Sequence, residues 1–300
     1  MNPTDIPGYE RFAKVEPITK GMAGDAKYYI EAMDGRKRLL RVADASEYAR
    51  RKAEYDTMRQ AWALGVPMPE PLDFGYCNDG QSVYTLIEWI DGKEAIALLP
   101  ALPETEQYLL GKQSGEALRL IHQIPAPTGL PDWAERYFGV MDDRFAAYRK
   151  EGVPFAGNDS ILAYLDSHRE LLKARPQCHL HGDFHTGNMI VTDEGKLHII
   201  DWHFVDFDSA GDPWSELTCV ETAYPAFSSG QISGYFGGEP PEAFWPLFAY
   251  YVAASALASI VWAKYFAPDE LQSRMELNEC VLRWFDGMKD PVARWYGKDF

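Results

Sequence analysis

The chain has 300 residues, of which 46% are hydrophobic and 14% aromatic; this is enough to bury a substantial core and excludes a mainly disordered protein. Lys and Arg total 29 against 45 Asp and Glu, which gives a net charge of −16. Because so acidic a chain repels a phosphate backbone, we expect no nucleic-acid partner.

The first ninety residues have the pattern of a small sheet with one main helix. Alternating and β-branched segments predict strands over residues 9–20, 27–33, 38–43, 72–76 and 82–89. Residues 21–25 are predicted to form a glycine-containing turn between the first two strands. A helix is predicted from Asp44, with Glu47 completing a capping box, to Gly65.

Helical patterns dominate after residue 90. They cover residues 104–123, 133–150, 160–174, 242–265 and 268–288, with one hairpin at 189–200. Residues 243–263 carry no charge, but Pro246, Ser255 and Ser259 interrupt the segment, so we expect a buried helix and no membrane contact. The sequence predicts two domains, a sheet lobe at 1–90 and a helical lobe at 91–300.

The cysteines and the first twelve residues indicate in which cellular compartment the protein is expected. Cys77, Cys178, Cys219 and Cys280 are widely separated and form no C-x-x-C pair, which argues against a disulfide framework. The first twelve residues have neither the basic nor the apolar region of a secretory signal. We therefore expect a cytoplasmic protein, either monomeric or homodimeric.

The densest polar cluster is the segment 181–188, His-Gly-Asp-Phe-His-Thr-Gly-Asn, followed by Asp201 at the end of the hairpin. Asn188 and Asp201 offer the hard oxygen ligands that Mg²⁺ prefers, while Asp183 can accept a proton. This combination is typical of phosphoryl transfer, in which positioning and charge neutralisation carry the catalysis.

These motifs resemble the aminoglycoside phosphotransferase family of small-molecule kinases. The segments that carry the resemblance are H-G-D-x-x-x-x-N at 181–188, I-D-W at 200–202, G-D-P at 211–213 and the helix end at 118–122. The resemblance covers essentially the whole chain. It implies an α+β, bilobal, protein-kinase-like fold, ATP as co-substrate with GTP as the alternative, and Mg²⁺. It also implies Asp183 as the catalytic base and Asn188 and Asp201 as metal ligands.

The same resemblance assigns a nucleotide site to the first lobe. The residues it implies are Gly21, Met22, Ala23 and Gly24 in the turn, Arg41 on the third strand, Glu54 on the helix, and Glu88 and Ile90 in the hinge. Arg41 stands where the family usually has lysine, and we expect it to pair with Glu54. Lys37 and Arg38 remain alternatives for this cation.

Acidic residues that follow Asp201 are candidates for binding the acceptor. Candidate substrate ligands are Asp206, Asp208, Glu216, Glu221 and the C-terminal Phe300. Acidic side chains favour a cationic hydroxylated molecule, with aminoglycosides first and choline, macrolides or other metabolites as alternatives. The same acidity is equally explained by solubility. Trp202, Trp214 and Tyr224 are candidates for a cation–π wall.

The same residues also resemble the motifs of two other enzyme classes. His179, His181 and His185 approach the histidine pattern of zinc-dependent hydrolases, although the spacing is one position late. A protein kinase fits less well, because no A-P-E segment follows Asp201 at the expected distance. Phosphotransfer to a small molecule is the function that the sequence favours.

Overall fold

The computed structural model describes residues 4–19, 25–151, 153–202, 209–218 and 224–297. The chain forms two compact units: Met1–Leu98 with Gly187–Phe204, and Leu99–Thr186 with Val205–Phe300. The α+β architecture expected from the sequence is confirmed. Packing also joins the 187–204 segment to the first unit, although it lies far beyond residue 90 in the chain.

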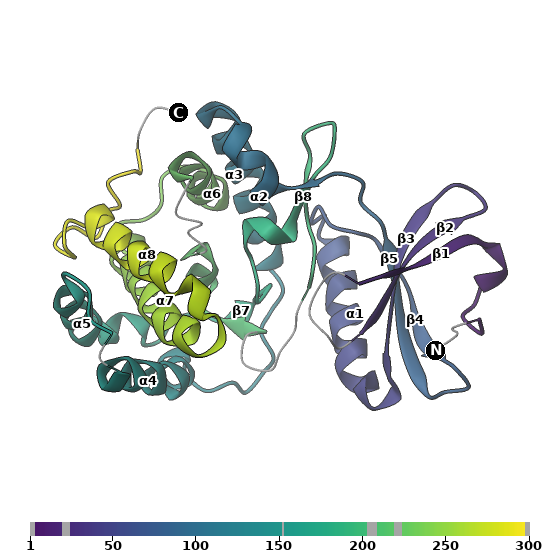
Figure 1. Cartoon of the computed structure of the whole chain (residues 1–300), viewed down its shortest axis with the longest axis horizontal. Helices are drawn as coiled ribbons and strands as arrows, with labels where there is room; N and C mark the ends of the chain where they lie inside the picture. The colour runs from purple at the N-terminus through teal and green to yellow at the C-terminus, as the bar shows by residue number, and fades with distance from the viewer. Residues whose placement is uncertain (1–3, 20–24, 152, 203–208, 219–223, 298–300) are drawn as a thin grey trace. The chain divides into compact units, whose positions relative to one another are not determined.

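The first unit contains a five-stranded antiparallel sheet (Figure 1). Its strands, in the order β1-β2-β3-β5-β4, are β1 (Phe12–Ile18), β2 (Ala26–Ala32), β3 (Lys37–Asp44), β5 (Ser82–Glu88) and β4 (Pro71–Cys77). Alternation along β3 places Leu40 and Val42 in a buried cluster with Ile30 and Leu86. The intervening residue, Arg41, therefore belongs to the opposite face of the sheet.

Helix α1 (Tyr48–Ala63) packs against β4 and β5 of this sheet. Asp44 caps the turn before the helix, since its side chain accepts a hydrogen bond of 2.9 Å from the Ser46 amide. A 3-10 turn (Ala45–Glu47) intervenes, so the helix begins at Tyr48, four residues later than predicted. Gly65 has a φ of +83°, a conformation that favours glycine just after a helix.

A second, three-stranded sheet completes the first unit. It has the order β6-β8-β9, with β6 (Lys93–Glu94), β8 (Met189–Val191) and β9 (Leu197–Ile199). The short helix α2 (Ala95–Leu98) follows β6. The Ile199 amide also donates to the Pro67 carbonyl at 2.8 Å. These backbone bonds fix the hairpin that carries Asn188 and Asp201 to the first unit.

The second unit is mainly helical. Its helices are α3 (Glu104–Ile121), α4 (Trp133–Glu151), α5 (Asn158–Ser167), α6 (Pro225–Phe236), α7 (Phe244–Phe266) and α8 (Leu271–Trp284). The short strands β7 (Cys178–His179) and β10 (Ala210–Gly211) pair antiparallel. Two helices are shorter than predicted, because the segment after α5 and the segment before α8 form 3-10 turns at Arg169–Leu172 and Pro268–Glu270.

Helix α7 forms much of the core of the second unit. Its Phe244, Phe248 and Tyr250 side chains are fully buried, and the ring of Phe248 contacts that of Phe285. Among the described residues, α7 is the one helix long and apolar enough to cross a membrane, and 78% of its most apolar window is buried. Buried core helices meet the same criteria of length and hydropathy, so α7 is only weak evidence for a membrane span.

Helix α6 was not predicted, because its sequence PAFSSGQISGYF is rich in glycine and serine, which are poor helix formers. It packs against α3 at very short range. A Cβ atom added at Gly115 would lie 2.0 Å from the Gln231 carbonyl oxygen, and one at Gly230 would lie 2.0 Å from the Tyr108 carbonyl oxygen. The glycines thus permit a close helix pair whose packing compensates for low helix propensity.

Candidate active site

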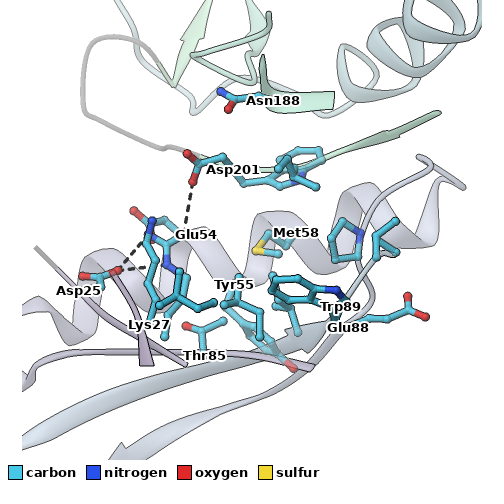
Figure 2. Close-up of a pocket in the computed structure, with 18 of the residues that line it drawn as sticks. Asp25, Lys27, Glu54, Tyr55, Met58, Thr85, Glu88, Trp89, Asn188 and Asp201 are labelled. Carbon is cyan, nitrogen blue, oxygen red and sulfur yellow. Dashed lines mark hydrogen bonds and ion pairs between the residues drawn. The ribbon is translucent and has the colours of Figure 1, made fainter. Parts of the chain in front are cut away.

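A cavity of about 410 Å³ lies within the first unit, between its main sheet, helix α1 and the β8–β9 hairpin (Figure 2). Three polar side chains form a row across its floor. Lys27 on β2 is the cross-strand partner of Arg41 on β3, and Arg41 is the partner of Thr85 on β5. Cross-strand partners share a face of the sheet, so the register brings two cations into one cavity.

Arg41 lies in this cavity, as the sequence predicts, but its partner is Asp25. Its Nε and Nη2 atoms donate to Oδ2 of Asp25 at 3.2 and 2.9 Å. Glu54, the expected partner, instead accepts a hydrogen bond of 2.8 Å from Arg51, three residues earlier on α1. Arg51 also donates to the other oxygen of Asp25. The four side chains form one nearly buried chain of charges.

The arrangement of these charges has a physical reason. The Asp25 side chain is only 5% exposed, and a buried carboxylate requires charged partners. An arginine fork can serve two acceptors, which a compact lysine ammonium does less well. Arginine at position 41 thus matches Asp25, the residue just before β2. The predicted Arg41–Glu54 pair is replaced by a chain of ion pairs that runs from Arg41 through Asp25 and Arg51 to Glu54.

Lys27 is a cavity residue that sequence reasoning missed. The alternative cations considered for the site, Lys37 and Arg38, do not line the cavity. Lys37 forms a salt bridge of 2.8 Å with Asp91. The cross-strand register to Arg41 identifies Lys27, and that register depends on the length of the turn that joins β2 to β3. In the sequence, the alternation of side chains along β2 was the signal that could have placed Lys27 on the cavity face of the sheet.

Asn188 and Asp201 line the same cavity and lie on the side opposite the β-sheet floor (Figure 2). Asn188 is buried, and Arg41 Nη1 lies 4.0 Å from Oδ1 of Asp201. Asp201 has a φ of +60°, a conformation that is uncommon for non-glycine residues and concentrates at functional sites. The amide and carboxylate oxygens fit the donor set of Mg²⁺.

The hinge residues Glu88 and Ile90 also line the cavity, together with Trp89. The Glu88 amide donates to the Glu70 carbonyl at 2.9 Å, and the Trp89 amide donates to the Lys37 carbonyl at 3.1 Å. The edge of Trp89 contacts the ring of Tyr29. These contacts fix the segment at one end of the cavity.

Asp183 lines a second cavity, of about 670 Å³, that lies within the second unit. The preceding residue, Gly182, has a φ of +86°, which explains a glycine at the centre of the H-G-D motif. Half of the Asp183 side chain is exposed, and Nε2 of His185 lies 3.4 Å from Oδ1 of Asp183. The aspartate is therefore accessible to a ligand in this cavity.

Glu216 lines the Asp183 cavity, but its carboxylate also holds the loop that carries Asp183. Its Oε1 accepts from the Gly182 amide at 2.7 Å, and its Oε2 accepts from the His181 amide at 2.8 Å. His122 Nε2 lies 3.0 Å from Oε2. Burial acts to raise the pKa of Glu216, but the hydrogen bond and charge of His122, with His181, outweigh it and lower that pKa.

Asp212, in the G-D-P segment, is held by side chains from other parts of the second unit. It is fully buried and accepts from Arg175 Nε at 2.7 Å and from the Tyr251 hydroxyl at 2.9 Å. The guanidinium of Arg175 lies 4.0 Å from the ring of Trp214. The segment thus ties β10 and α7 together.

Several predicted site residues lie outside the described part of the chain. They are Gly21, Met22, Ala23, Gly24, Asp206, Asp208, Glu221 and Phe300. Among the residues that the structure does describe, no group of three His, Cys, Asp or Glu side chains is placed to hold a metal ion. The zinc-hydrolase alternative, which needs the histidines at 179, 181 and 185, therefore has no structural support.

Comparisons with known proteins identify the family and the fold. The model of the APH phosphotransferase enzyme family matches residues 14–244. No curated protein matches the sequence. A choline/ethanolamine kinase family protein from Mesorhizobium loti is 18% identical, with a TM-score of 0.64, covering 96% of this chain and 95% of that one.

Two aminoglycoside phosphotransferase structures share the fold. A thermostable mutant of APH(4)-Ia is 18% identical, with a TM-score of 0.61, covering 94% of this chain and 98% of that one. The streptomycin–ATP–APH(2″)-IIa complex is 16% identical, with a TM-score of 0.60, covering 93% and 99%. With the family match spanning most of its length and the fold shared almost end to end, the chain belongs to the APH phosphotransferase enzyme family and is a small-molecule kinase.

Proposed function

We propose that this kinase transfers the γ-phosphate of ATP to a hydroxyl group of a small molecule. The observation that carries the proposal is the first-unit cavity, in which Arg41 and Lys27 face Asn188 and Asp201. Cations on one side suit the phosphates, and oxygen ligands on the other suit a divalent metal. Aminoglycoside phosphotransferase APH(2″)-IIa has been solved with ATP and streptomycin, which supports ATP as co-substrate.

The nucleotide site extends along the cavity from the hinge to the charged row. We assign the adenine to backbone groups of Glu88 and Ile90, and the phosphates to Arg41, Lys27 and the turn at 21–24. Mg²⁺, held by Asn188 and Asp201, would neutralise phosphate charge when bound. The domains then divide by role, with nucleotide binding in 1–90 and the catalytic loop and acceptor pocket in 91–300.

Asp183 is assigned as the catalytic base. It lines the second-unit cavity with an accessible carboxylate, and Glu216 positions its loop through two backbone amides. An aspartate in this role accepts the proton of the attacking hydroxyl and orients it. Glu216 thus acts as a positioning residue, although the sequence suggested it as a substrate ligand.

The acceptor predicted from the sequence is a cationic molecule, with aminoglycosides first. The net charge of −16 and the aminoglycoside kinases that share this fold support this class. A second candidate is an uncharged or macrolide-like alcohol, which the aromatic walls of the Asp183 cavity favour. We place the reaction in the cytoplasm, with a monomer or homodimer as the working unit.

The test is ADP release by purified protein with Mg·ATP and a panel of acceptors: aminoglycosides, macrolides, choline, homoserine and sugars. The Asp183→Asn variant is expected to lose about a thousandfold in turnover with the accepted substrate, the usual contribution of a general base. Asp193→Asn, in the exposed hairpin turn, is the matched control and should keep full turnover. The proposal is wrong if the wild type exceeds Asp183→Asn with none of these acceptors.

Binding is measured separately from chemistry. Mg·ATP should raise the melting temperature of both the wild type and Asp183→Asn, because a ligand of the folded state stabilises it. An Asp201→Asn variant should need a higher Mg²⁺ concentration for the same shift. Equal Mg²⁺ dependence in the two proteins would contradict the metal assignment.

A further inference from the structure

Two cations, Lys27 on β2 and Arg41 on β3, lie next to each other on the floor of the first-unit cavity, because they are cross-strand partners. Such partners have Cβ atoms about 5 Å apart, so both side chains reach the same part of the cavity. Asn188 and Asp201 lie on the opposite side (Figure 2). A phosphate chain placed between the two sides is within reach of both cations, and the partners that each cation already has distinguish them.

The Arg41 guanidinium is already engaged by carboxylates of the protein. Its Nε and Nη2 atoms donate to Asp25, and its Nη1 atom lies 4.0 Å from Oδ1 of Asp201. Within the chain of ion pairs, the acids Asp25 and Glu54 offset the charges of Arg41 and Arg51. Asp25 is 5% exposed, so a phosphate that drew Arg41 away would leave a buried carboxylate with one cation fewer. Moving Arg41 onto a phosphate is therefore unfavourable.

Lys27 has no such commitment. It follows Asp25 by two residues, but both oxygens of that carboxylate accept from arginines. Among the described residues, no carboxylate lies within ion-pair distance of the Lys27 ammonium. In the sequence, residues 20–24 before Asp25 contain a lysine and no acid. A lysine ammonium is a compact charge with three donors on a flexible four-carbon stem, which suits it to a phosphate that arrives and leaves.

We propose that Lys27 makes the direct contact to the nucleotide phosphates and that Arg41 keeps Asp25 as its partner when the nucleotide binds. This inference rests on the proposed function and specifies which of the two cations binds phosphate. The contact that was expected from the third strand thus comes from the neighbouring position on the second strand. Arg41 adds its charge to the cavity from the place in which Asp25 holds it.

The first experiment measures how much the phosphates add to nucleotide binding. Calorimetry gives the Kd of adenosine divided by the Kd of Mg·ATP, and this Kd ratio isolates the phosphate contribution. Lys27→Met keeps an unbranched side chain but removes the charge, and it should lower the ratio about ten- to a hundredfold, the value of one charge-assisted hydrogen bond. Lys14→Met, at an exposed lysine of β1 that pairs with Glu16, is the matched control and should keep the wild-type ratio. An unchanged ratio in Lys27→Met would overturn the proposal.

Two further measurements test the charge of Lys27 and the partner of Arg41. Lys27→Arg keeps the charge and should recover most of the lost ratio, and a variant no better than Lys27→Met would contradict a charge contact. A crystal structure with Mg²⁺ and a non-hydrolysable ATP analogue needs no substitution. It should show the Lys27 ammonium about 2.8 Å from a phosphate oxygen, with Arg41 still bound to Asp25. Arg41 on the phosphate, with Lys27 directed away from it, would refute the proposal.

These measurements need no acceptor, which separates this proposal from the proposed function. If the Kd ratio falls in Lys27→Met but no acceptor of the panel is phosphorylated, the Lys27 assignment stands and the phosphotransfer proposal fails. If an acceptor is phosphorylated and Lys27→Met keeps both the Kd ratio and the wild-type KM for ATP, phosphotransfer stands and the Lys27 assignment is refuted.

Discussion

Arg41 donates two hydrogen bonds to a single oxygen of Asp25, from Nε at 3.2 Å and from Nη2 at 2.9 Å. The other oxygen of that carboxylate accepts from Arg51, which in turn binds Glu54. Asp25 thus joins the strand cation to the helix carboxylate through a second arginine. The position and orientation of Arg41 in the first-unit cavity depend on this aspartate.

Replacing Asp25 with asparagine should be strongly destabilising. The substitution leaves Arg41 and Arg51 without their shared anion in a site where Asp25 is 5% exposed. Breaking one partner of a buried ionic network costs about 3 kcal/mol of unfolding free energy. Urea unfolding measures this value. Asp34→Asn breaks an exposed pair with Arg36 and should cost at most about 1 kcal/mol. Equal losses in the two variants would contradict the bridging role.

Glu216→Gln should reduce turnover more than nucleotide binding. The amide cannot accept from the His181 and Gly182 backbone with both of its atoms, so the Asp183 loop loses one anchor. Losing a charge-assisted hydrogen bond of about 1.5–3 kcal/mol predicts a fall of about ten- to a hundredfold in kcat. The KM for ATP should stay close to that of the wild type. Glu279→Gln, on the exposed face of α8, should leave both constants unchanged, and a rise confined to KM would contradict the positioning role.

Burial lowers the pKa of His179 to about 4, although the nearby Glu216 charge acts in the opposite direction. The fold therefore favours the neutral imidazole, whereas the unfolded chain binds a proton near pH 6.5. As the pH falls from about 6.5 to about 4, the unfolded state gains that proton and the folded state does not. The unfolding free energy should drop by up to about 3 kcal/mol across this window, with no further contribution from His179 below it.

Urea unfolding of the wild type and His179→Gln at several pH values between 4 and 7 measures this contribution. The slope of stability against pH should be smaller in the variant, whatever its stability at neutral pH. Comparing slopes keeps the test independent of the packing that the substitution changes. Identical slopes in the two proteins would show that His179 does not carry this pH dependence.

The sequence predicted much of the fold because its strands and most helices follow their ordinary periods. The hairpin that presents Asn188 and Asp201 was predicted from local signals, a turn at Asp193-Glu194-Gly195 between two apolar runs. The family motifs then assigned chemistry to these residues. Local pattern was sufficient wherever the partner residues lie close together in the chain.

Other features depend on contacts that no local pattern encodes. Asp25 meets Arg51 across 26 positions, and Glu216 meets the His181 amide across 35. Lys27 enters the cavity through the register of β2 against β3. Helix α6 has weak helix propensity and is stabilised by its packing on α3. In each case the tertiary structure determines the feature, and neither helix propensity nor motif spacing predicts it.

The close packing of α3 on α6 gives a last test, which concerns stability. An added Cβ at Gly115 would lie 2.0 Å from the Gln231 carbonyl oxygen and 2.6 Å from the Tyr235 amide, so Gly115→Ala forces the two backbones apart. We expect a loss of about 3 kcal/mol in the free energy of unfolding. Gly139→Ala, on α4, has open space around the new methyl group and should gain up to about 1 kcal/mol from helix propensity. Urea unfolding should therefore change in opposite directions in two Gly→Ala variants of the same unit, and a stabilised Gly115→Ala would refute the close contact between the helices.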